Sequence, residues 1–382
     1  MSKSITIFTE VYSPEDFRIN EIVEFLKKKY HVTIITRVPS YPKGILFQGF
    51  ANRIQKEICD NVIIYRYPIF LDYDRYKIRK VLNLLWQPIA LSFAYARIRP
   101  KNIFIFQTGS LYQYLFLIFV PKSKPVVLWS QDLWPEAGYH SLSVLKLLDK
   151  VLKKVTRTIL KSSNTLVVQS NAFAEHYLSN YCLKSLVIPN FSPVEMKKNP
   201  NITRDTNLLY AGNIGSAQNL DQLILFFIKI RKNLPTYFTR FDIYGDGSEL
   251  QALKTKYSQS KDIFFHGRIP RIELDGKVIK SKFVCLSLPD SVVNKTIPGR
   301  FQYFYNMGCN ILYLGKGEVK HLIESTQCGL VLDSTSEKSL AEIFNNFDLN
   351  NHIYRKDIFN QSKILLMLHD VINSTFFSHK SF

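Results

Sequence analysis

The chain has 382 residues, of which 46% are hydrophobic and 21% are charged, and it carries a formal net charge of +19 at pH 7. This length suits two domains of roughly 150 to 200 residues, and the composition excludes a disordered chain. The five cysteines are scattered, with no C-x-x-C pair, which predicts neither a disulfide framework nor a zinc site. The apolar run at the start of the chain is too short for the core of a signal peptide, so we expect a cytoplasmic protein.

The first half of the chain alternates strand-like and helix-like segments. Two predicted strands, 4–10 and 31–38, flank an amphipathic helix over 16–30, and this βαβ unit implies parallel pairing. The most apolar window, 103–121, is interrupted by polar residues, which favours a buried strand and a buried helix over a membrane span. Further strands are predicted over 62–69, 102–108, 125–132, 165–170 and 185–190, and further helices over 76–98, 110–119, 142–162 and 171–180.

A polar stretch without periodicity, 191–206, is the predicted linker. It separates a first doubly wound α/β domain over 1–190 from a second over 207–360, and we expect 361–382 to form a helix or tail that packs back on the first domain. The carboxyl ends of both sheets would then face one cleft, where such sheets bind ligands. Strands of the second domain are predicted over 207–213, 240–247, 263–269, 283–289, 309–315 and 328–334.

A glycine-containing loop follows the strand predicted over 207–213. Gly212 and Gly215 could let backbone N–H groups approach an anion at the start of the next helix, or could serve only to reverse the chain. The loop contains no lysine or arginine, so an anion held there needs positive charge from elsewhere.

Two arginines follow glycines at predicted strand or helix ends. Arg300 lies after Gly299 in the first turn of a helix that is expected to end at Gly308. A cation at a helix N-terminus is unfavourable unless an anion is bound, which favours a ligand-binding role. Arg268 has a similar place, although Arg271 nearby could serve equally well.

Five segments of this chain, in this order, resemble the nucleotide-sugar domain of GT-B glycosyltransferases of family 4. They are YAGNIGSAQNLDQLI, YGDGSELQALK, HGRIPRIEL, IPGRFQYFYNMGCNILY and IESTQCGLVLD. Within that family they most resemble the WbuB-like group of bacterial enzymes, which build O-antigen, capsule or exopolysaccharide. Three segments of the first half, YSPEDFRINEIVEFL, RVPSYPKG and WSQDLWPEA, resemble the acceptor domain of the same group. The resemblance implies an α/β GT-B fold of two Rossmann-like domains. It also implies retaining transfer of a hexose or N-acetylated amino sugar from a nucleoside diphosphate sugar, with no metal or other cofactor.

The resemblance also implies roles for residues of the second half. Arg268 and Arg300 would be catalytic, because their charge would stabilise the departing diphosphate. The backbone of the loop at Gly212 would supply hydrogen-bond donors. The donor site that it implies comprises Gly212, Asn213, Gly215, Gly245, Arg268, Thr296, Gly299, Arg300 and Tyr303.

The chain departs from the family at two positions. Many members carry two glutamates eight residues apart, where this chain has Lys295 and Tyr303. Tyr303 could contact the ribose of the nucleotide or belong to the core. Without these two glutamates the identity of the donor sugar stays open. A catalytically idle subunit that only scaffolds an assembly complex is an alternative.

Carboxylates at two predicted strand ends of the first half are candidates for the acceptor site. Asp132 is the candidate catalytic base for an acceptor hydroxyl, and its alternative role is a helix N-cap. Glu136 is expected beside the acceptor, and its alternative is a solvent-exposed side chain. Glu15 and Asp16 are also expected to face the acceptor, with an N-cap as the alternative for Asp16.

The positive charge is concentrated in the first half. Residues 1–190 contain 26 Lys+Arg and 13 Asp+Glu, a balance of +13, against 24 and 18, or +6, in 191–382. Basic, aromatic-bearing helices within 74–100 and 145–161 suit a peripheral protein on the inner face of the cytoplasmic membrane that takes a polyprenyl-linked or saccharide acceptor. Solvated helix faces are the alternative. A nucleic-acid-binding protein is the rival class, but no helix-turn-helix, zinc or RNA-binding signature supports it, so no nucleic acid partner is expected.

Overall fold

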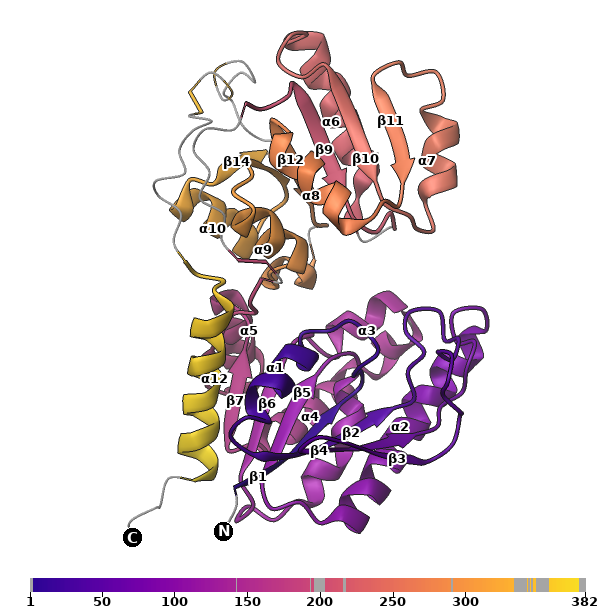
Figure 1. The fold of residues 1–382 in the computed structure, drawn as a ribbon, viewed down its shortest axis with the longest axis vertical. Helices are drawn as coiled ribbons and strands as arrows, with labels where there is room; N and C mark the ends of the chain where they lie inside the picture. The colour runs from indigo at the N-terminus through magenta and orange to yellow at the C-terminus, as the bar shows by residue number, and fades with distance from the viewer. Residues whose placement is uncertain are drawn as a thin grey trace. The chain divides into compact units, whose positions relative to one another are not determined.

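The chain divides into two compact units (Figure 1). Unit 1 comprises Met1–Ile188 and Ser362–Phe382, and unit 2 comprises Pro189–Gln361. The predicted linker 191–206 falls within unit 2. The computed structural model describes residues 3–141, 143–192, 194–195, 203–215, 218–289, 291–332, 342, 344, 346–347 and 357–377. Within these ranges no helix has both the length and the apolar character needed to cross a membrane.

The described part of unit 1 contains a sheet of eight strands in the order β3-β4-β2-β1-β5-β6-β7-β8. β3 runs antiparallel to β4, and the other neighbouring pairs are parallel. Every residue of the central strands β5 and β6 is buried, as expected when both faces of a parallel sheet are covered. The strands are β1 (Ser4–Thr9), β2 (His31–Arg37), β3 (Gln55–Cys59), β4 (Val62–Tyr67), β5 (Ile103–Gln107), β6 (Val126–Ser130), β7 (Thr165–Val168) and β8 (Leu186–Val187).

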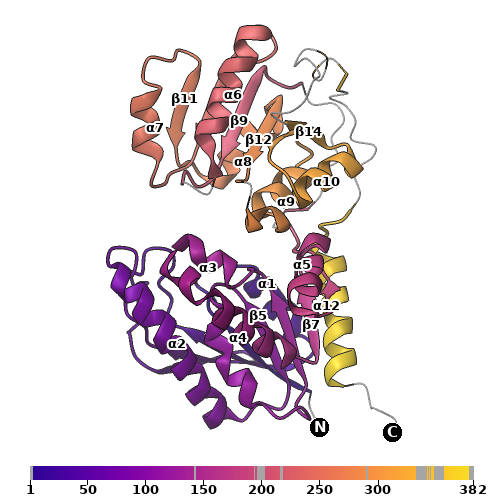
Figure 2. The same cartoon turned by 180° about the vertical axis from the view of Figure 1, so that it is seen from behind.

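Helices cover both faces of this sheet. α1 lies on the face seen in Figure 1, whereas α2 and α4 lie on the face seen in Figure 2. The helical segments of unit 1 are α1 (Ile19–Leu26), α2 (Lys77–Ile98), η1 (Leu111–Phe119), α3 (Glu136–Ser141), η2 (Ser143–Leu148), α4 (Asp149–Lys161), α5 (Asn171–Tyr181) and α12 (Gln361–Phe376).

Several elements differ from their sequence-based predictions. The helix predicted over 16–30 begins only at Ile19, because the Asn20 side chain binds the Ser13 N–H and the Glu15 carbonyl and holds the preceding loop. The segment predicted as a helix over 110–119 is a 3₁₀ segment. In place of the helix predicted over 142–162 there are two segments, η2 and α4, and residue 142 lies outside the described residues. Neither α3 nor β3 was predicted; β3 is mostly exposed and lacks an apolar alternation.

The last helix, α12, belongs to unit 1 although it follows unit 2 in the sequence. Leu368 is fully buried. The Thr375 and Thr165 hydroxyls are 2.8 Å apart, and the Phe377 ring stacks on that of Tyr30 at 5.5 Å. The C-terminal segment therefore completes the packing of unit 1.

Unit 2 contains, in its described part, a parallel sheet of six strands in the order β11-β10-β9-β12-β13-β14. This order reverses between β9 and β12, as the order of unit 1 reverses between β1 and β5. Crossovers from such neighbouring strands diverge and leave a crevice at the carboxyl ends. The elements are β9 (Asn207–Ala211), α6 (Leu220–Asn233), β10 (Arg240–Tyr244), α7 (Leu250–Lys256), β11 (Ile263–Gly267), α8 (Arg271–Lys280), β12 (Phe283–Ser287), η4 (Val292–Lys295), α9 (Gly299–Asn306), β13 (Ile311–Leu314), α10 (Glu318–Thr326) and β14 (Gly329–Leu332).

Alternate residues of β9 separate the core of unit 2 into two clusters. Leu208 and Tyr210 pack with the apolar side of α6, while Leu209 and Ala211 pack with residues of α8, α9 and α10. This division follows from the two-residue period of a strand. It places β9 between two helix layers and fixes where its carboxyl end emerges.

The predicted end of α9 at Gly308 is confirmed. Gly308 has a φ of +73°, its N–H donates to the Tyr305 carbonyl at 3.1 Å, and the Cys309 N–H donates to the Phe304 carbonyl at 3.1 Å. These bonds satisfy the last carbonyls of the helix in a Schellman arrangement.

We expect Leu368→Ala to destabilise unit 1 by about 2–5 kcal/mol, because it removes a fully buried side chain from the α12 contact. Leu366→Ala, at a residue that is 51% exposed on the same helix, is the matched control and should cost under about 1 kcal/mol. Urea unfolding followed by tryptophan fluorescence reports on unit 1, which holds all three tryptophans. Equal costs for the two variants would contradict the packing of α12 on this unit.

Candidate functional site

The loops after β9 and β10 of unit 2 contact each other backbone to backbone. Gly245 has a φ of +140°, and a Cβ there would lie 1.8 Å from the Gly212 carbonyl oxygen. The Gly212 N–H donates to the Tyr244 carbonyl at 2.9 Å. Only glycine fits at 245, because any side chain would separate the two loops.

Alternate N–H groups of the loop after β9 are used inside the protein. Those of Gly212 and Ile214 donate to the Tyr244 and Asp246 carbonyls, each at 2.9 Å. Those of Asn213 and Gly215 make no hydrogen bond to any residue that the structure describes. The expectation that Gly212 offers its N–H to a ligand is therefore wrong, because that group is occupied. Asn213 and Gly215 keep two backbone donors available.

A pocket of about 290 Å³ opens beside this loop. Arg268 enters it directly after β11; its side chain is 75% exposed, and its Nε lies 4.0 Å from the Asp246 carboxylate. Because this ion pair is long and exposed to solvent, it holds the arginine only weakly. The guanidinium can therefore turn toward an anion. The pocket is lined by Gly212, Asn213, Tyr244, Gly245, Asp246, Arg268, Ile269 and Leu274.

Arg300 reaches the same loop from α9. Its Nη1 donates to the Ala211 carbonyl at 3.3 Å, and its guanidinium lies 5.1 Å from the centroid of the Tyr210 ring. A Cβ at Gly212 would lie 2.3 Å from Nη1, so the guanidinium rests on the glycine itself. The structure thus brings a positive charge to a loop that has none in its own sequence, although Arg300 is not among the residues that line the pocket.

The other sequence-predicted donor residues lie outside the lining of this pocket. Thr296 and Gly299 precede or begin α9, and Gly215 lies further along the glycine loop. The Tyr303 hydroxyl donates to the Asp275 carboxylate at 2.5 Å, and its ring packs against the core cluster of α8 and α9. These contacts favour the core alternative for Tyr303 over a contact with ribose.

Unit 1 has its own pocket, of about 280 Å³, where β1 and β5 end. Carboxylate, guanidinium and amide groups line it together with tryptophan and tyrosine rings, a mixture suited to a polar ring such as a sugar. The lining residues are Glu10, Arg37, Tyr41, Ile69, Tyr73, Lys80, Asn83, Leu84, Gln87, Gly109, Ser110, Trp134 and Gly138.

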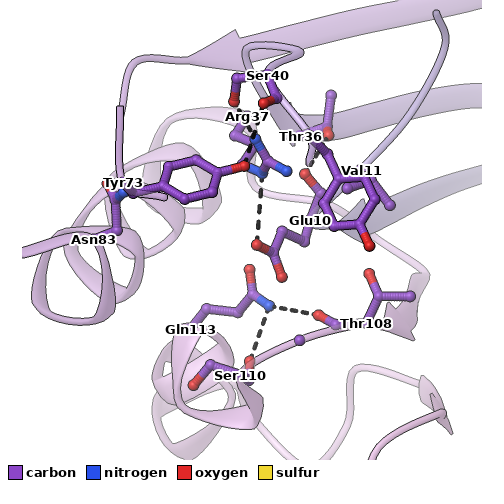
Figure 3. A network of polar contacts seen from close by, with 12 residues as sticks. Glu10, Val11, Thr36, Arg37, Ser40, Tyr73, Asn83, Thr108, Ser110 and Gln113 are labelled. Carbon is purple, nitrogen blue, oxygen red and sulfur yellow. Dashed lines mark hydrogen bonds and ion pairs between the residues drawn. The ribbon is translucent and has the colours of Figure 1, made fainter. Parts of the chain in front are cut away.

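A buried arginine organises this pocket. Arg37 is 2% exposed, and it lies 3.5 Å from a Glu10 oxygen and 3.4 Å from a Glu15 oxygen. Figure 3 shows its guanidinium between Glu10 and Ser40, to whose hydroxyl it donates. Glu15 also accepts from the N–H groups of Ser40 and Tyr41, at 2.9 and 2.7 Å. The expected acceptor-facing role of Glu15 does not fit this burial, because its carboxylate instead fixes the loop after β2.

Two carboxylates meet at Gly109. The Gly109 N–H donates to Asp132 Oδ2 at 3.0 Å, and a Cβ at Gly109 would lie 1.9 Å from Glu10 Oε2. Burial raises the pKa of Glu10 although the Arg37 charge opposes it, and burial raises the pKa of Asp132 although the Gly109 N–H opposes it. Each carboxylate is therefore a stronger base than an exposed one. Asp132 is no helix N-cap, since α3 begins only at Glu136.

None of the four predicted acceptor residues is among those that line this pocket; Asp132 reaches it only through its contact with Gly109. Asp16 is exposed, and it is not the N-cap of α1, which is Arg18. Glu136 is not simply exposed to solvent, because its side chain is 16% exposed and lies 3.4 Å from His176 Nε2.

No known family profile and no curated protein matches the sequence. Three solved structures that are similar over nearly the whole chain are glycosyltransferases or bind a nucleotide sugar. A UDP-forming α,α-trehalose-phosphate synthase from Burkholderia vietnamiensis is 10% identical, with a TM-score of 0.69, over 100% of this chain and 99% of that one. The E. coli structure described as "Trehalose-6-phosphate … bound with UDP-2-fluoro glucose" is 8% identical, with a TM-score of 0.66, over 97% of this chain and 99% of that one. WaaG, a glycosyltransferase involved in lipopolysaccharide biosynthesis, is 11% identical, with a TM-score of 0.62, over 97% and 99%.

This chain has the GT-B fold. At these sequence identities, 8–11%, the likeness establishes the fold alone.

Some pocket residues of this GT-B chain were missed by the sequence analysis. Tyr244 and Asp246 line the pocket of unit 2, and Arg37 and Trp134 line that of unit 1. Arg37 had a usable signal, since a charged residue at the end of an otherwise buried strand needs an ionic partner. Asp246 and Trp134 lie outside helices and strands, where the sequence alone does not indicate the side-chain direction, and Tyr244 is the last residue of β10.

We expect Gly245→Ala to destabilise unit 2 by about 1–3 kcal/mol, because its Cβ would overlap the Gly212 carbonyl. Gly276→Ala, in α8 with no atom within 4 Å of its Cβ, should be neutral or stabilising by up to about 1 kcal/mol. Thermal unfolding by circular dichroism measures both, and hydrogen exchange in β9 and β10 localises the effect. Similar stability of the two variants would refute the contact between the loops.

The raised pKa of Asp132 predicts a pH dependence of stability. Because the folded-state pKa lies above the unfolded value near 3.8, the folded state binds this proton more tightly, and the resulting stabilisation is lost as pH rises through the folded value. Asp132→Asn keeps an oxygen for the Gly109 N–H but does not titrate. Relative to this variant, the wild type should lose stability as pH rises above the unfolded value near 3.8 and through the raised folded-state value. Urea midpoints from tryptophan fluorescence test this, and parallel pH profiles would contradict it.

Proposed function

We propose that this protein is a retaining glycosyltransferase that moves a hexose or N-acetylated amino sugar from a nucleoside diphosphate sugar to a lipid-linked or saccharide acceptor. The observation that carries the proposal is the anion-binding chemistry of the loop after β9. Its Asn213 and Gly215 N–H groups are unused by the described chain, while Arg268 lines the adjoining pocket and Arg300 rests on Gly212. Neutral donors and nearby guanidinium groups together suit a diphosphate.

The proposed donor half-reaction uses these groups in unit 2. The bond between the sugar's anomeric carbon and the diphosphate oxygen breaks, and negative charge grows on the diphosphate. Backbone N–H groups and Arg268 would bind that charge directly, while Arg300 would stabilise it from the end of β9. Because the arginines supply positive charge, we propose transfer without a bound metal. The UDP-2-fluoro glucose in the similar E. coli structure supports a nucleotide-sugar donor.

The proposed acceptor site is the pocket of unit 1. Asp132 and Glu10, which meet at Gly109, would accept a hydrogen bond from the reacting hydroxyl. Their raised pKa values favour this role, since a stronger base holds a proton better as the new bond forms. Trp134 would contact the acceptor's ring.

We place the reaction in O-antigen, capsule or exopolysaccharide assembly on the inner face of the cytoplasmic membrane. The net charge of +19 would favour an anionic bilayer, from which a polyprenyl-linked acceptor would be taken. The printed role of WaaG in lipopolysaccharide biosynthesis supports this setting.

A catalytically idle scaffold subunit is the second candidate. Tyr303 stands where many relatives of the resembled family carry a glutamate, and its hydroxyl is engaged by Asp275. A scaffold would bind a nucleotide without turning over its sugar. Donor hydrolysis therefore separates the two candidates.

We expect one of UDP, GDP and dTDP to raise the melting temperature of the protein selectively, and the matching nucleotide sugar to be turned over. Arg300→Ala should lower donor turnover roughly 100-fold, because it removes charge stabilisation of the leaving group. Arg271→Ala is the matched control; this arginine lies over the Tyr303 ring, outside the pocket lining, and its loss should change turnover less than about threefold.

Chromatography of sugar products and melting curves of both variants complete this test. Full turnover by a folded Arg300→Ala protein would overturn the proposed role of this residue. Nucleotide binding without any turnover would favour the scaffold, and retention by nucleic acid with no nucleotide response would favour the nucleic-acid-binding class.

A further inference from the structure

A third cavity, of about 800 Å³, lies in unit 1 between α2, β3 and β4. We call it the α2 groove. It shares no lining residue with the pocket at Gly109. Its walls include Trp86, Ile89 and Phe93 from α2 and Ile54 and Tyr65 from the sheet edge. The volume lies within the range of small-molecule sites, which are predominantly apolar.

The walls of the α2 groove expose large apolar side chains to solvent. Ile89 is 61% exposed, Phe93 is 60% exposed and Ile54 is 69% exposed. Leu85, at 62%, continues the stripe one helical turn before Ile89. Trp86 is held in place by donating its indole N–H to the Pro68 carbonyl at 2.6 Å. A contiguous exposed apolar surface of this kind indicates an apolar partner.

The charge at the α2 groove has one sign. Its lining includes Lys56, Arg66 and Arg97 but no acidic residue. Arg66 is buried and paired with Glu57 at 2.6 Å. For Lys56 and Arg97, both exposed, no carboxylate of the described chain lies within ion-pair distance. Two cations are thus available to an anionic group at the groove.

The cations are placed beside and at one end of the apolar walls. Lys56 pairs with Tyr65 in the sheet and lies over its ring at 5.8 Å. Arg97 follows Trp86 by eleven residues, about 16 Å along the axis of α2. An occupant that matches this layout has a long apolar chain and an anionic group near one end.

We propose that the α2 groove binds the hydrocarbon chain of an anionic membrane lipid, one whose head group carries a phosphate and a net negative charge, with Lys56 and Arg97 facing that phosphate. The inference deepens the proposed membrane location and rests on that part of the proposed function. Lysine and arginine suit this place because their long stems lie along apolar surface while their charges reach a head group. The groove would anchor unit 1 independently of the pocket at Gly109.

The test uses dodecyl phosphate as the probe, below its micelle concentration, with binding measured by calorimetry on the full chain. We expect saturable binding of one molecule, no binding of inorganic phosphate, and weaker binding of the uncharged dodecyl maltoside. Ile89→Asp and Arg97→Glu should each weaken binding at least tenfold. Ile272→Asp, at an exposed isoleucine of unit 2, is the matched control and should stay within twofold of the wild type.

Flotation with vesicles extends the test to membranes. Phosphatidylglycerol vesicles should retain the wild type and the Ile272→Asp protein, but retain Ile89→Asp at least tenfold less, whereas phosphatidylcholine vesicles should retain none of them. Melting curves establish folding, and Phe93→Gln is a milder second variant of the same wall. Loss of binding in Ile272→Asp equal to that in Ile89→Asp would overturn the proposal, as would displacement of the probe by inorganic phosphate.

Two further measurements distinguish lipid binding from self-association and from the transferase reaction. A concentration-dependent dimer that Ile89→Asp abolishes would assign the groove to a second copy of the chain and overturn lipid binding. The melting-temperature response to nucleotides is measured on the same variants. Lipid binding without any nucleotide response would overturn the transferase proposal and leave lipid binding by the groove intact, while the reverse result would overturn lipid binding alone.

Discussion

The reversal of strand order in each sheet is the constraint on which both pockets depend. In unit 1 the chain leaves β1 and β5 toward opposite faces, and in unit 2 it leaves β9 and β12 in the same way. The loops at these positions diverge, so polar side chains and backbone groups there are not covered by the next helix. Glu10 of one unit and Gly212 of the other lie directly after such strands, and Gly109 lies two residues after β5.

Close backbone packing and charge are supplied by different parts of unit 2. The loop after β9 must be small, because the Gly245 loop and the Arg300 guanidinium both press against Gly212. A lysine or arginine at position 212 would overlap the Arg300 guanidinium. The positive charge comes instead from α9 and from the end of β11, which leaves alternate N–H groups of the loop free to turn outward. In unit 1 the positive charge is buried instead: Arg37 offsets the charges of the Glu10 and Glu15 carboxylates and holds both side chains in position.

The sequence predicted the regular parts of this structure well and the turns poorly. Apolar runs such as 102–108 and 125–132 indicated buried strands, and Gly308 marked a helix end, because these signals arise from local backbone preferences and burial. The exposed edge strand β3 carries no such signal. The contact between Gly212 and Arg300, and the meeting of Glu10 and Asp132 at Gly109, depend on pairs far apart in the chain. Strand order brings them together, and local pattern does not encode the direction of a side chain in a turn. Glu15 is the clearest example. Its place after β1 suggested a side chain that faces the acceptor, but its carboxylate is buried against Arg37 and accepts hydrogen bonds from two N–H groups.

The position of α12 has a consequence for biosynthesis. Unit 1 receives its last helix only after the whole of unit 2 has been made, because 173 residues, 189–361, separate Ile188 from Ser362. At typical rates of translation this interval lasts on the order of 10–30 s, during which the surface around Tyr30 and Thr165 is uncovered in the nascent chain. Unit 2 is contiguous, so its core can form without any residue from outside 189–361. The two units therefore differ in when their packing can be completed during synthesis, because unit 1 needs α12, which is made only after unit 2.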